Sequence, residues 1–345
     1  MSESDPYAAV NDDGSIEGLD ASFVDVDGIT DRVDGISTRY YEYGSGDPLV
    51  LFHGGNWSGT ASANTWSRVV DGLSDEFRVL LPDRLGCGMT GNPADEDDFV
   101  YGAELEHAIS FIDTMGVDEF HVGGQSRGGG ISGRIAAEIP ERVKTFIPIQ
   151  TATLAPTAGN KDFMYARIHR DAPTDEDAPI YEADHYRHLY ALQEYSPDHV
   201  TDEYALAAGY MATRSKAERT RQVLEENGGQ ERWLATMRDH MATTHRRMKD
   251  GELQMPTLLY WARNDPGVDV VAGIGLYDLM AAENPRVEFQ LLNKAGHHLY
   301  REYPERFVET VTSFIAFHEE HGYDYGEPTR TYDDYTELRS YLERE

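Results

Sequence analysis

A serine stands in this sequence between a strand and a helix that almost touch, so the chain around it must turn sharply. Residues 120–122 form a short apolar run typical of a buried strand, and residues 131–139 fit a helix ended by Pro140. Between them lies the pentapeptide GQSRG, residues 124–128, with Ser126 at its centre. The glycines permit a turn in which a Cβ atom would collide with the backbone, and the strained serine lifts its hydroxyl clear of the sheet. The first amides of the helix then point at the serine, where negative charge would develop.

The alternation of strand and helix continues on both sides of this turn. A continuous apolar run predicts a buried strand at residues 49–52, and further strands are predicted at residues 23–29, 36–43, 78–81, 143–149, 256–261 and 287–292. Helical spacing of apolar residues is clear over residues 99–115, and another helix is expected over residues 304–318. The pattern predicts an α/β fold, built on a mainly parallel eight-stranded sheet with helices on both faces.

The alternation stops over residues 154–250, which are polar, rich in Tyr, His and Met, and without a convincing buried strand. We expect this segment to form a helical lid inserted between two parts of the core, residues 22–153 and 251–318. Residues 1–21 and 319–345 are acidic and lie outside the pattern. We expect the first of these segments to be flexible and poorly ordered.

Two candidate partners for the serine follow later strands. A serine nucleophile needs a histidine base and an acid that orients the base. Asp265 follows one predicted strand, with Asp269 as the alternative, and His297 follows the last strand. Other interpretations exist: Asp265 could cap a helix, and His297 with His298 could form a surface pair or half of a metal site. Because each residue follows a strand, we predict a triad of Ser126, Asp265 and His297.

An acyl-transfer site also needs two backbone N–H groups that bind the oxyanion. We expect one from Arg127, directly after the serine. The other is expected from Gly55, in the glycine-rich stretch that follows the predicted strand at residues 49–52. The alternative interpretation of His53-Gly-Gly is a glycine turn without a catalytic role.

These features together resemble the α/β-hydrolase superfamily from about residue 23 to residue 317, because that superfamily has a G-x-S-x-G turn and the order serine, acid, histidine. The resemblance implies a serine hydrolase without a metal or a cofactor. In the superfamily the acid can also follow the strand at residues 143–149, but the next residues read QTATLAP and offer no carboxylate. This leaves Asp265 as the expected acid.

The stretch HGGNWSGTASAN resembles the oxyanion loop of the meta-cleavage-product hydrolases, which cleave carbon–carbon bonds. That branch carries H-G-x-G-P-G and an asparagine at the spacing of Asn64. In this sequence, Asn56 and Trp57 stand where that branch has Gly-Pro. Gln125 replaces the asparagine that precedes the serine there, and His298 replaces the tryptophan that follows the histidine. The resemblance implies that these five residues contact the substrate. It also implies that an arginine of the lid binds the carboxylate of the substrate. The comparable position of this sequence holds Ala208, and Arg214 lies nearby but displaced.

We therefore predict a serine hydrolase that forms an acyl-enzyme, with a small or medium carboxylic ester as the first expectation. The alternatives are a carbon–carbon bond hydrolase of the meta-cleavage-product type, a cofactor-free perhydrolase or acyltransferase, and a non-catalytic ligand-binding protein on the same scaffold. The expected partner is a small molecule, and the oligomeric state is left open. His185 and His188 could bind a metal, but such a pair on a polar helix is more often solvated surface.

Composition narrows these expectations further. The chain holds 62 Asp and Glu against 30 Lys and Arg, a formal net charge of −32, so phosphate backbones would be repelled and nucleic-acid binding is not expected. No apolar run is long enough for a bilayer, and the N-terminus lacks the pattern of a signal peptide. Cys87 is the one cysteine, which excludes an intramolecular disulfide. We expect a cytoplasmic protein without membrane contact.

The charge also generates a prediction about salt. An acidic surface with only five lysines suits a halophilic protein, because concentrated salt screens the repulsion between its carboxylates. We predict a higher melting temperature in molar KCl than in dilute buffer, measured by circular dichroism. A melting temperature that does not rise in KCl would favour the alternative, an ordinary acidic protein from an arginine-favouring genome.

Overall fold

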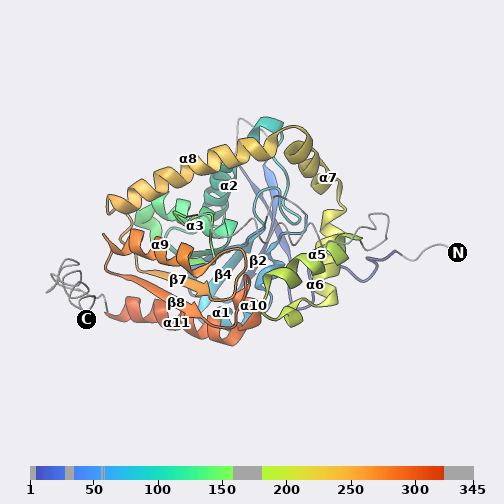
Figure 1. Ribbon diagram of the computed structural model, residues 1–345. Helices are drawn as coiled ribbons and strands as arrows, with labels where there is room; N and C mark the ends of the chain where they lie inside the picture. The colour runs from blue at the N-terminus through green and yellow to red at the C-terminus, as the bar shows by residue number, and fades with distance from the viewer. Residues whose placement is uncertain (1–4, 28–34, 56, 58, 158–180, 322–345) are drawn as a thin grey trace, which may run out of the picture.

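The computed structural model describes residues 5–27, 35–55, 57, 59–157 and 181–321, which form one central sheet covered by helices (Figure 1). The sheet has eight strands in the order β1-β2-β4-β3-β5-β6-β7-β8. The first two strands run antiparallel to their neighbours, and the others are parallel. The predicted fold class is confirmed, and each predicted strand overlaps an observed one. Their bounds are β1 (Ser22–Val26), β2 (Ile36–Tyr43), β3 (Asp47–Phe52), β4 (Phe77–Pro82), β5 (Phe120–Gln125), β6 (Val143–Ile149), β7 (Thr257–Ala262) and β8 (Val287–Leu292).

Helices lie on both faces of the sheet, because the side chains of each central strand point alternately to the two faces. In β7, Leu259 and Trp261 join one buried apolar cluster, whereas Leu258 and Tyr260 join the other. One face carries α2 (Tyr101–Thr114), α3 (Arg127–Glu138), α8 (Gly229–Lys249) and α9 (Val270–Ala281); the other carries α1 (Val70–Ser74), α10 (Leu299–Glu302) and α11 (Pro304–His321). Short helical turns complete the core at η1 (Ala63–Trp66), η2 (Glu96–Asp98) and η3 (Pro140–Arg142).

The helical insertion between β6 and β7 has two parts, one beside the cavity edge of the sheet and one packed against the core helices. Helices α5 (Tyr181–Gln193) and α6 (Asp202–Ala212) pack side by side, with η4 (Pro197–His199) between them in the chain and α7 (Ser215–Arg221) after them. A π-helical turn, η5 (Gln222–Glu226), leads into α8, which runs along α2 and α3 (Figure 1). Trp233, Met241 and Met248 of α8 are buried in the core cluster. The last part of the segment expected as a lid is therefore a layer of the core.

The N-terminal segment differs from our expectation of poor order. Residues 5–21 pack onto the core, where Ile16 and Leu19 are buried in an apolar cluster. The Asp13 carbonyl accepts a hydrogen bond from the Arg39 guanidinium, 2.7 Å away. An acidic segment can be ordered in this way when its few apolar side chains and its backbone oxygens find buried partners. Residues 1–4, and the acidic C-terminal tail beyond His321, lie outside the described residues.

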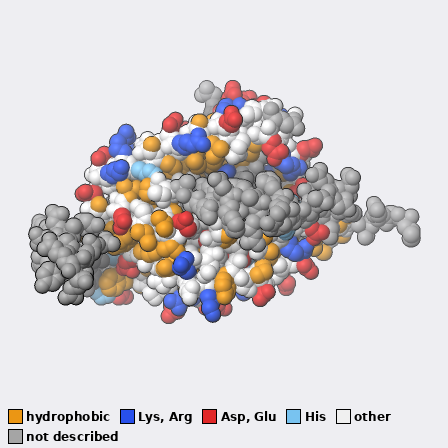
Figure 2. Space-filling model, in the orientation of Figure 1, with side chains coloured by type: hydrophobic (Ala, Val, Ile, Leu, Met, Phe, Trp, Pro, Cys, Tyr) orange, Lys and Arg blue, Asp and Glu red, His pale blue; other side chains and the backbone are white. Residues whose placement is uncertain are grey.

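Acidic side chains are spread over the face shown in Figure 2, with basic side chains between them, rather than gathered in one patch. In the described part of the chain, no helix combines the length and the apolar character needed to cross a bilayer.

Candidate active site

The turn between β5 and α3 has the strained geometry that its sequence predicts. Ser126 has φ 54° and ψ −117°, and its N–H donates to the Ile149 carbonyl at 3.0 Å. A Cβ atom on Gly124 would lie 2.3 Å from the Gly128 carbonyl oxygen. A Cβ atom on Gly128 would lie 2.1 Å from the carbonyl oxygen of Phe52. Both glycines are therefore required where β3, β5 and α3 meet.

Asp265 and His297 lie together beside this turn. The Nδ1 atom of His297 is 2.5 Å from Oδ2 of Asp265, and both residues are buried. The second carboxylate oxygen of Asp265 accepts the N–H groups of Gly267 at 2.7 Å and Val268 at 3.0 Å. These bonds fix the carboxylate so that Nδ1 of the histidine carries the proton and Nε2 is left as the basic nitrogen. His297 and Ser126 line the same cavity.

Gln150 is a polar residue of this site that the sequence analysis did not identify. It follows β6, has φ 41°, and is fully buried. Its side-chain amide donates to Oδ2 of Asp265 at 2.6 Å, and its oxygen accepts the N–H of Ala262 at 2.9 Å. Gln150 thus fixes the same carboxylate oxygen that faces His297. Its position directly after a parallel strand was the signal that could have identified it.

The loop after β3 brings Gly55, with φ +83°, to the wall of the cavity. His53 precedes it and is fully buried; burial, together with the Arg84 guanidinium, lowers the pKa of His53 to about 3. The neutral ring accepts the N–H of Arg84 on Nε2, at 3.0 Å, so Nδ1 donates to the Gly54 carbonyl at 2.8 Å. His53 therefore fixes the direction of a peptide group in this loop.

The cavity has a volume of about 870 Å³ and lies between the carboxyl edge of the sheet and the helical insertion. Ser126, Arg127 and His297 line it from the core. The insertion contributes aromatic, acidic and basic side chains to its wall, among them Glu182, His185, Tyr186, Tyr190, Arg221, Glu225 and Glu231. The cavity can therefore receive a molecule that has both an apolar or aromatic part and polar groups.

The five residues expected to contact a substrate have different positions. Trp57 and His298 line the cavity, and Asn56 lies outside the described residues. Gln125 is fully buried and donates to the carbonyl of His297 at 3.2 Å. It is the last residue of β5, and its side-chain oxygen lies beside Gly54. The expectation that Gln125 contacts the substrate is corrected: its amide is bound to the backbone of His297.

The position of Asn64 is also a correction. The residue is buried in η1, where its amide group donates to the Gly14 carbonyl at 2.9 Å. Its oxygen accepts the hydroxyl of Tyr41 at 2.6 Å. The short helical turn directs this side chain beneath the N-terminal segment, so Asn64 contributes to packing.

His298 has a buried carboxylate partner of its own. Its Nδ1 atom is 2.5 Å from Oε1 of Glu194, and its backbone N–H donates to the second carboxylate oxygen at 3.0 Å. Burial lowers the pKa of His298 to about 4, whereas the nearby His298 and His199 hold the pKa of Glu194 below its usual value despite its burial. The Tyr190 ring stacks on the imidazole, with 4.5 Å between ring centroids. A neutral imidazole with Nδ1 bound in this way presents Nε2 as a hydrogen-bond acceptor.

The arginine implied for the lid is not at the expected place. Ala208 is buried, and the guanidinium of Arg214 lies over the ring of Tyr210, 4.0 Å from its centroid. Arg221, the last residue of α7, lines the cavity instead, as does Arg127. The sequence offers no signal for Arg221, because the path of the insertion decides which arginine faces the cavity.

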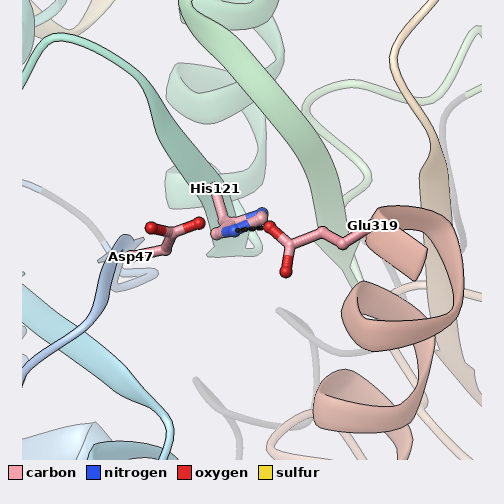
Figure 3. Close-up of side chains that lie close together, drawn as sticks. All are labelled: Asp47, His121 and Glu319. Carbon is pink, nitrogen blue, oxygen red and sulfur yellow. Dashed lines mark ion pairs between the residues drawn. The ribbon is translucent and has the colours of Figure 1, made fainter. Parts of the chain in front are cut away.

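A group of possible metal ligands lies at the opposite edge of the sheet. Figure 3 shows the carboxylates of Asp47 and Glu319 on either side of the His121 ring, with Nε2 of His121 at 3.4 Å from Glu319. Nδ1 of His121 is 2.9 Å from the Thr145 hydroxyl oxygen. The ammonium group of Lys144 is bound to both carboxylates. Because Lys144 already supplies the positive charge that these carboxylates need, we assign no metal to this cluster.

Comparisons with known proteins give one consistent family. Residues 47–304 match the family model described as alpha/beta hydrolase fold. The 2-hydroxymuconate semialdehyde hydrolase of Pseudomonas sp. (strain CF600) is 26% identical over 283 residues, 82% of this chain and 91% of that protein. The solved meta-cleavage product hydrolase of Pseudomonas fluorescens IP01 has a TM-score of 0.65 and 21% identity, over 82% of this chain and 95% of that one. The 2-hydroxy-6-oxo-6-phenylhexa-2,4-dienoate hydrolase of Rhodococcus sp. strain RHA1 also has a TM-score of 0.65, with 18% identity, over 86% of this chain and 100% of that one.

The contact between Gln150 and Asp265 generates a prediction about the reactivity of the serine. The variant Gln150→Leu should react with a fluorophosphonate roughly 10- to 100-fold more slowly than the wild type, because a hydrogen bond to a charged group contributes about 1.5–3 kcal/mol. The measurement is the second-order rate of Ser126 labelling, with folding checked by circular dichroism. Gln254→Leu is the control, since Gln254 is exposed and bonds only to backbone oxygens. Equal rates in the two folded variants would contradict the prediction.

Proposed function

Since the chain belongs to the alpha/beta hydrolase fold family and is a hydrolase, we propose that it cleaves a carbon–carbon bond next to a ketone, in a substrate of the 2-hydroxy-6-oxo-dienoate type. The observation that carries this proposal is the set of relatives that cover most of the chain. At 25–27% identity they are named as hydrolases of 2-hydroxymuconate semialdehyde or of 2-hydroxy-6-oxo-dienoates. A carboxylic ester was the first substrate expected from the sequence. Because the names of these relatives point to carbon–carbon bond cleavage, we keep the ester as the second candidate.

In the proposed reaction, Ser126 attacks the ketone carbon while His297 takes its hydroxyl proton. Asp265 keeps the histidine in the required tautomer and stabilises its charged form. The N–H groups of Gly55 and Arg127 bind the oxyanion. The carbon–carbon bond then breaks, and the departing carbon takes the proton from His297; its electron pair is delocalised over the conjugated chain before protonation. Water, deprotonated by His297, finally releases the acyl group from the serine as a carboxylic acid.

The cavity offers groups suited to the rest of such a substrate. Among the described residues of the wall, Arg127 and Arg221 carry guanidinium groups that could pair with the carboxylate of a dienoate. Nε2 of His298 is a suitable acceptor for the hydroxyl group, because Glu194 holds the opposite nitrogen. An ester without these groups would use only Ser126 and its partners.

The first prediction from this proposal compares two substrates. The wild type should hydrolyse 2-hydroxy-6-oxo-6-phenylhexa-2,4-dienoate with a higher kcat/KM than 4-nitrophenyl acetate, as measured by absorbance. Ser126→Ala should lose both activities by roughly 10⁴- to 10⁶-fold while remaining folded, because no other group can form the acyl-enzyme. Turnover of the ester alone would favour the second candidate. Undiminished activity of Ser126→Ala on both substrates would refute the serine mechanism.

The second prediction concerns the hydroxyl group of the substrate. His298→Phe retains a ring that can stack on Tyr190 but has no nitrogen acceptor. The wild type should prefer the hydroxylated dienoate to the analogue without the 2-hydroxyl, and the variant should lose roughly 3- to 10-fold of this preference, the value of one hydrogen bond. The measurement is the ratio of kcat/KM values for the two compounds. An unchanged ratio would show that His298 does not bind the hydroxyl group.

A further inference from the structure

A buried arginine lies behind the loop that carries Gly55. Arg84 follows β4, and its side chain is 1% exposed. Its Nη2 atom donates to the carbonyl oxygens of Gly54, at 3.0 Å, and of Gly55, at 2.6 Å. The backbone N–H of Arg84 also binds His53, which in turn donates to the Gly54 carbonyl. Two donors therefore hold this carbonyl group on the side of the loop that faces Arg84.

The direction of one carbonyl fixes the direction of the next N–H. In a planar trans peptide, the C=O of Gly54 and the N–H of Gly55 point in opposite directions. Since the carbonyl points at Arg84, the N–H points to the other side of the loop. That side carries the nucleophile, because a Cβ atom on Gly54 would lie 2.9 Å from Cβ of Ser126 and Gly55 lines the cavity.

The second half of the oxyanion site is connected to the same arginine. Glu104 of α2 forms a buried ion pair with Arg84 and accepts the indole N–H of Trp233, from α8, at 3.2 Å. The Arg127 guanidinium lies over the Trp233 ring, 4.2 Å from its centroid. A continuous series of contacts therefore joins the Gly54–Gly55 peptide to the residue whose N–H is the other expected donor.

This arrangement is costly for stability alone. An ion pair buried on both sides loses the hydration of two charges, and an apolar pair of similar size is often as stable or more so. Glu104 keeps the Arg84 side chain charged by raising its pKa above the usual value, against the effect of burial. Hydrogen bonds from a charged guanidinium strengthen the polarisation of the two peptide groups, and a polarised Gly54–Gly55 peptide is a stronger N–H donor.

We propose that Arg84 is a positioning residue of the oxyanion hole, which orients the Gly54–Gly55 peptide with its N–H toward the cavity and is itself held by Glu104. The inference rests on the proposed serine chemistry, because it concerns the site that binds the oxyanion. It predicts that Arg84 matters for the tetrahedral state and much less for substrate binding.

The test compares Arg84→Met with the wild type on two ligands. A trifluoromethyl ketone bearing a phenyl group forms a tetrahedral adduct with Ser126, and its affinity should fall by about 10²-fold in the variant, the typical effect of losing one oxyanion donor. The affinity of the hydroxylated phenyl dienoate, measured by calorimetry in a Ser126→Ala background, should fall by less than about 3-fold, because no adduct forms there. The affinity of Arg84→Lys for the trifluoromethyl ketone should lie between those of the wild type and Arg84→Met, since a lysine keeps the charge but lacks the planar guanidinium.

The control is Arg142→Met, at a residue that directly precedes β6, at the amino edge of the sheet. Arg142 also donates to two backbone carbonyls, those of Val117 and Asp118, so its loss should lower the melting temperature without changing either affinity. If Arg84→Met does not fold, Arg84→Lys and Glu104→Gln provide the comparison. Equal losses for both ligands, or none, would overturn the proposal for Arg84 alone. A wild type that binds the trifluoromethyl ketone no more tightly than Ser126→Ala does would overturn the serine chemistry as well.

Discussion

The function proposed for this protein depends on the direction in which two peptide groups point. One joins Gly54 to Gly55, and the other joins Ser126 to Arg127 at the start of α3. Neither direction is set by a helix or strand alone, because the first lies in a loop and the second follows a serine with φ 54°. Buried polar side chains and glycines without a Cβ atom fix both, and strain of this kind persists only where the surrounding structure enforces it.

The apolar side chains that stabilise the fold and the polar groups of the candidate site lie in different parts of the molecule. Two apolar clusters on the faces of the sheet supply most of the favourable burial. In the described part of the chain, buried charges lie near the carboxyl edge instead, in the ion pairs Arg39–Asp83 and Arg84–Glu104 and in the carboxylate of Glu194, which binds the neutral ring of His298. Each pair must recover the cost of its own desolvation through further hydrogen bonds. The carboxylate of Asp83 does so by also accepting the backbone N–H groups of Ala63 and Met89.

The sequence was sufficient to predict the eight strands, since the buried parallel strands are rich in apolar residues and the antiparallel pair β1 and β2 is rich in β-branched and aromatic residues. Ser126 directly follows β5, and Asp265 and His297 lie a few residues beyond the ends of β7 and β8, so the sequence could place all three at the same edge of the sheet. Glu194 could not be predicted, since it lies 104 residues from His298 and a single glutamate near a helix end is usually solvated. The error over Asn64 had another cause: a family spacing gives the position of a residue, whereas the short turn of η1 decides where its side chain points.

The division of the insertion into two places has a consequence for how such proteins can be recombined. Helices α5 to α7 contribute several described residues to the wall of the cavity, whereas α8 adds Gln230 and Glu231 at its start, carries Trp233 and packs into the core. A chimaera that exchanged the whole insertion would therefore break the contacts of Glu104 as well as change the wall. The natural crossover point is Gly228, directly before α8, which adopts φ +70° and where a Cβ atom would have no neighbouring atom within 4 Å. Exchange of the preceding helices up to that point would change the choice of substrate while leaving the proposed oxyanion site intact.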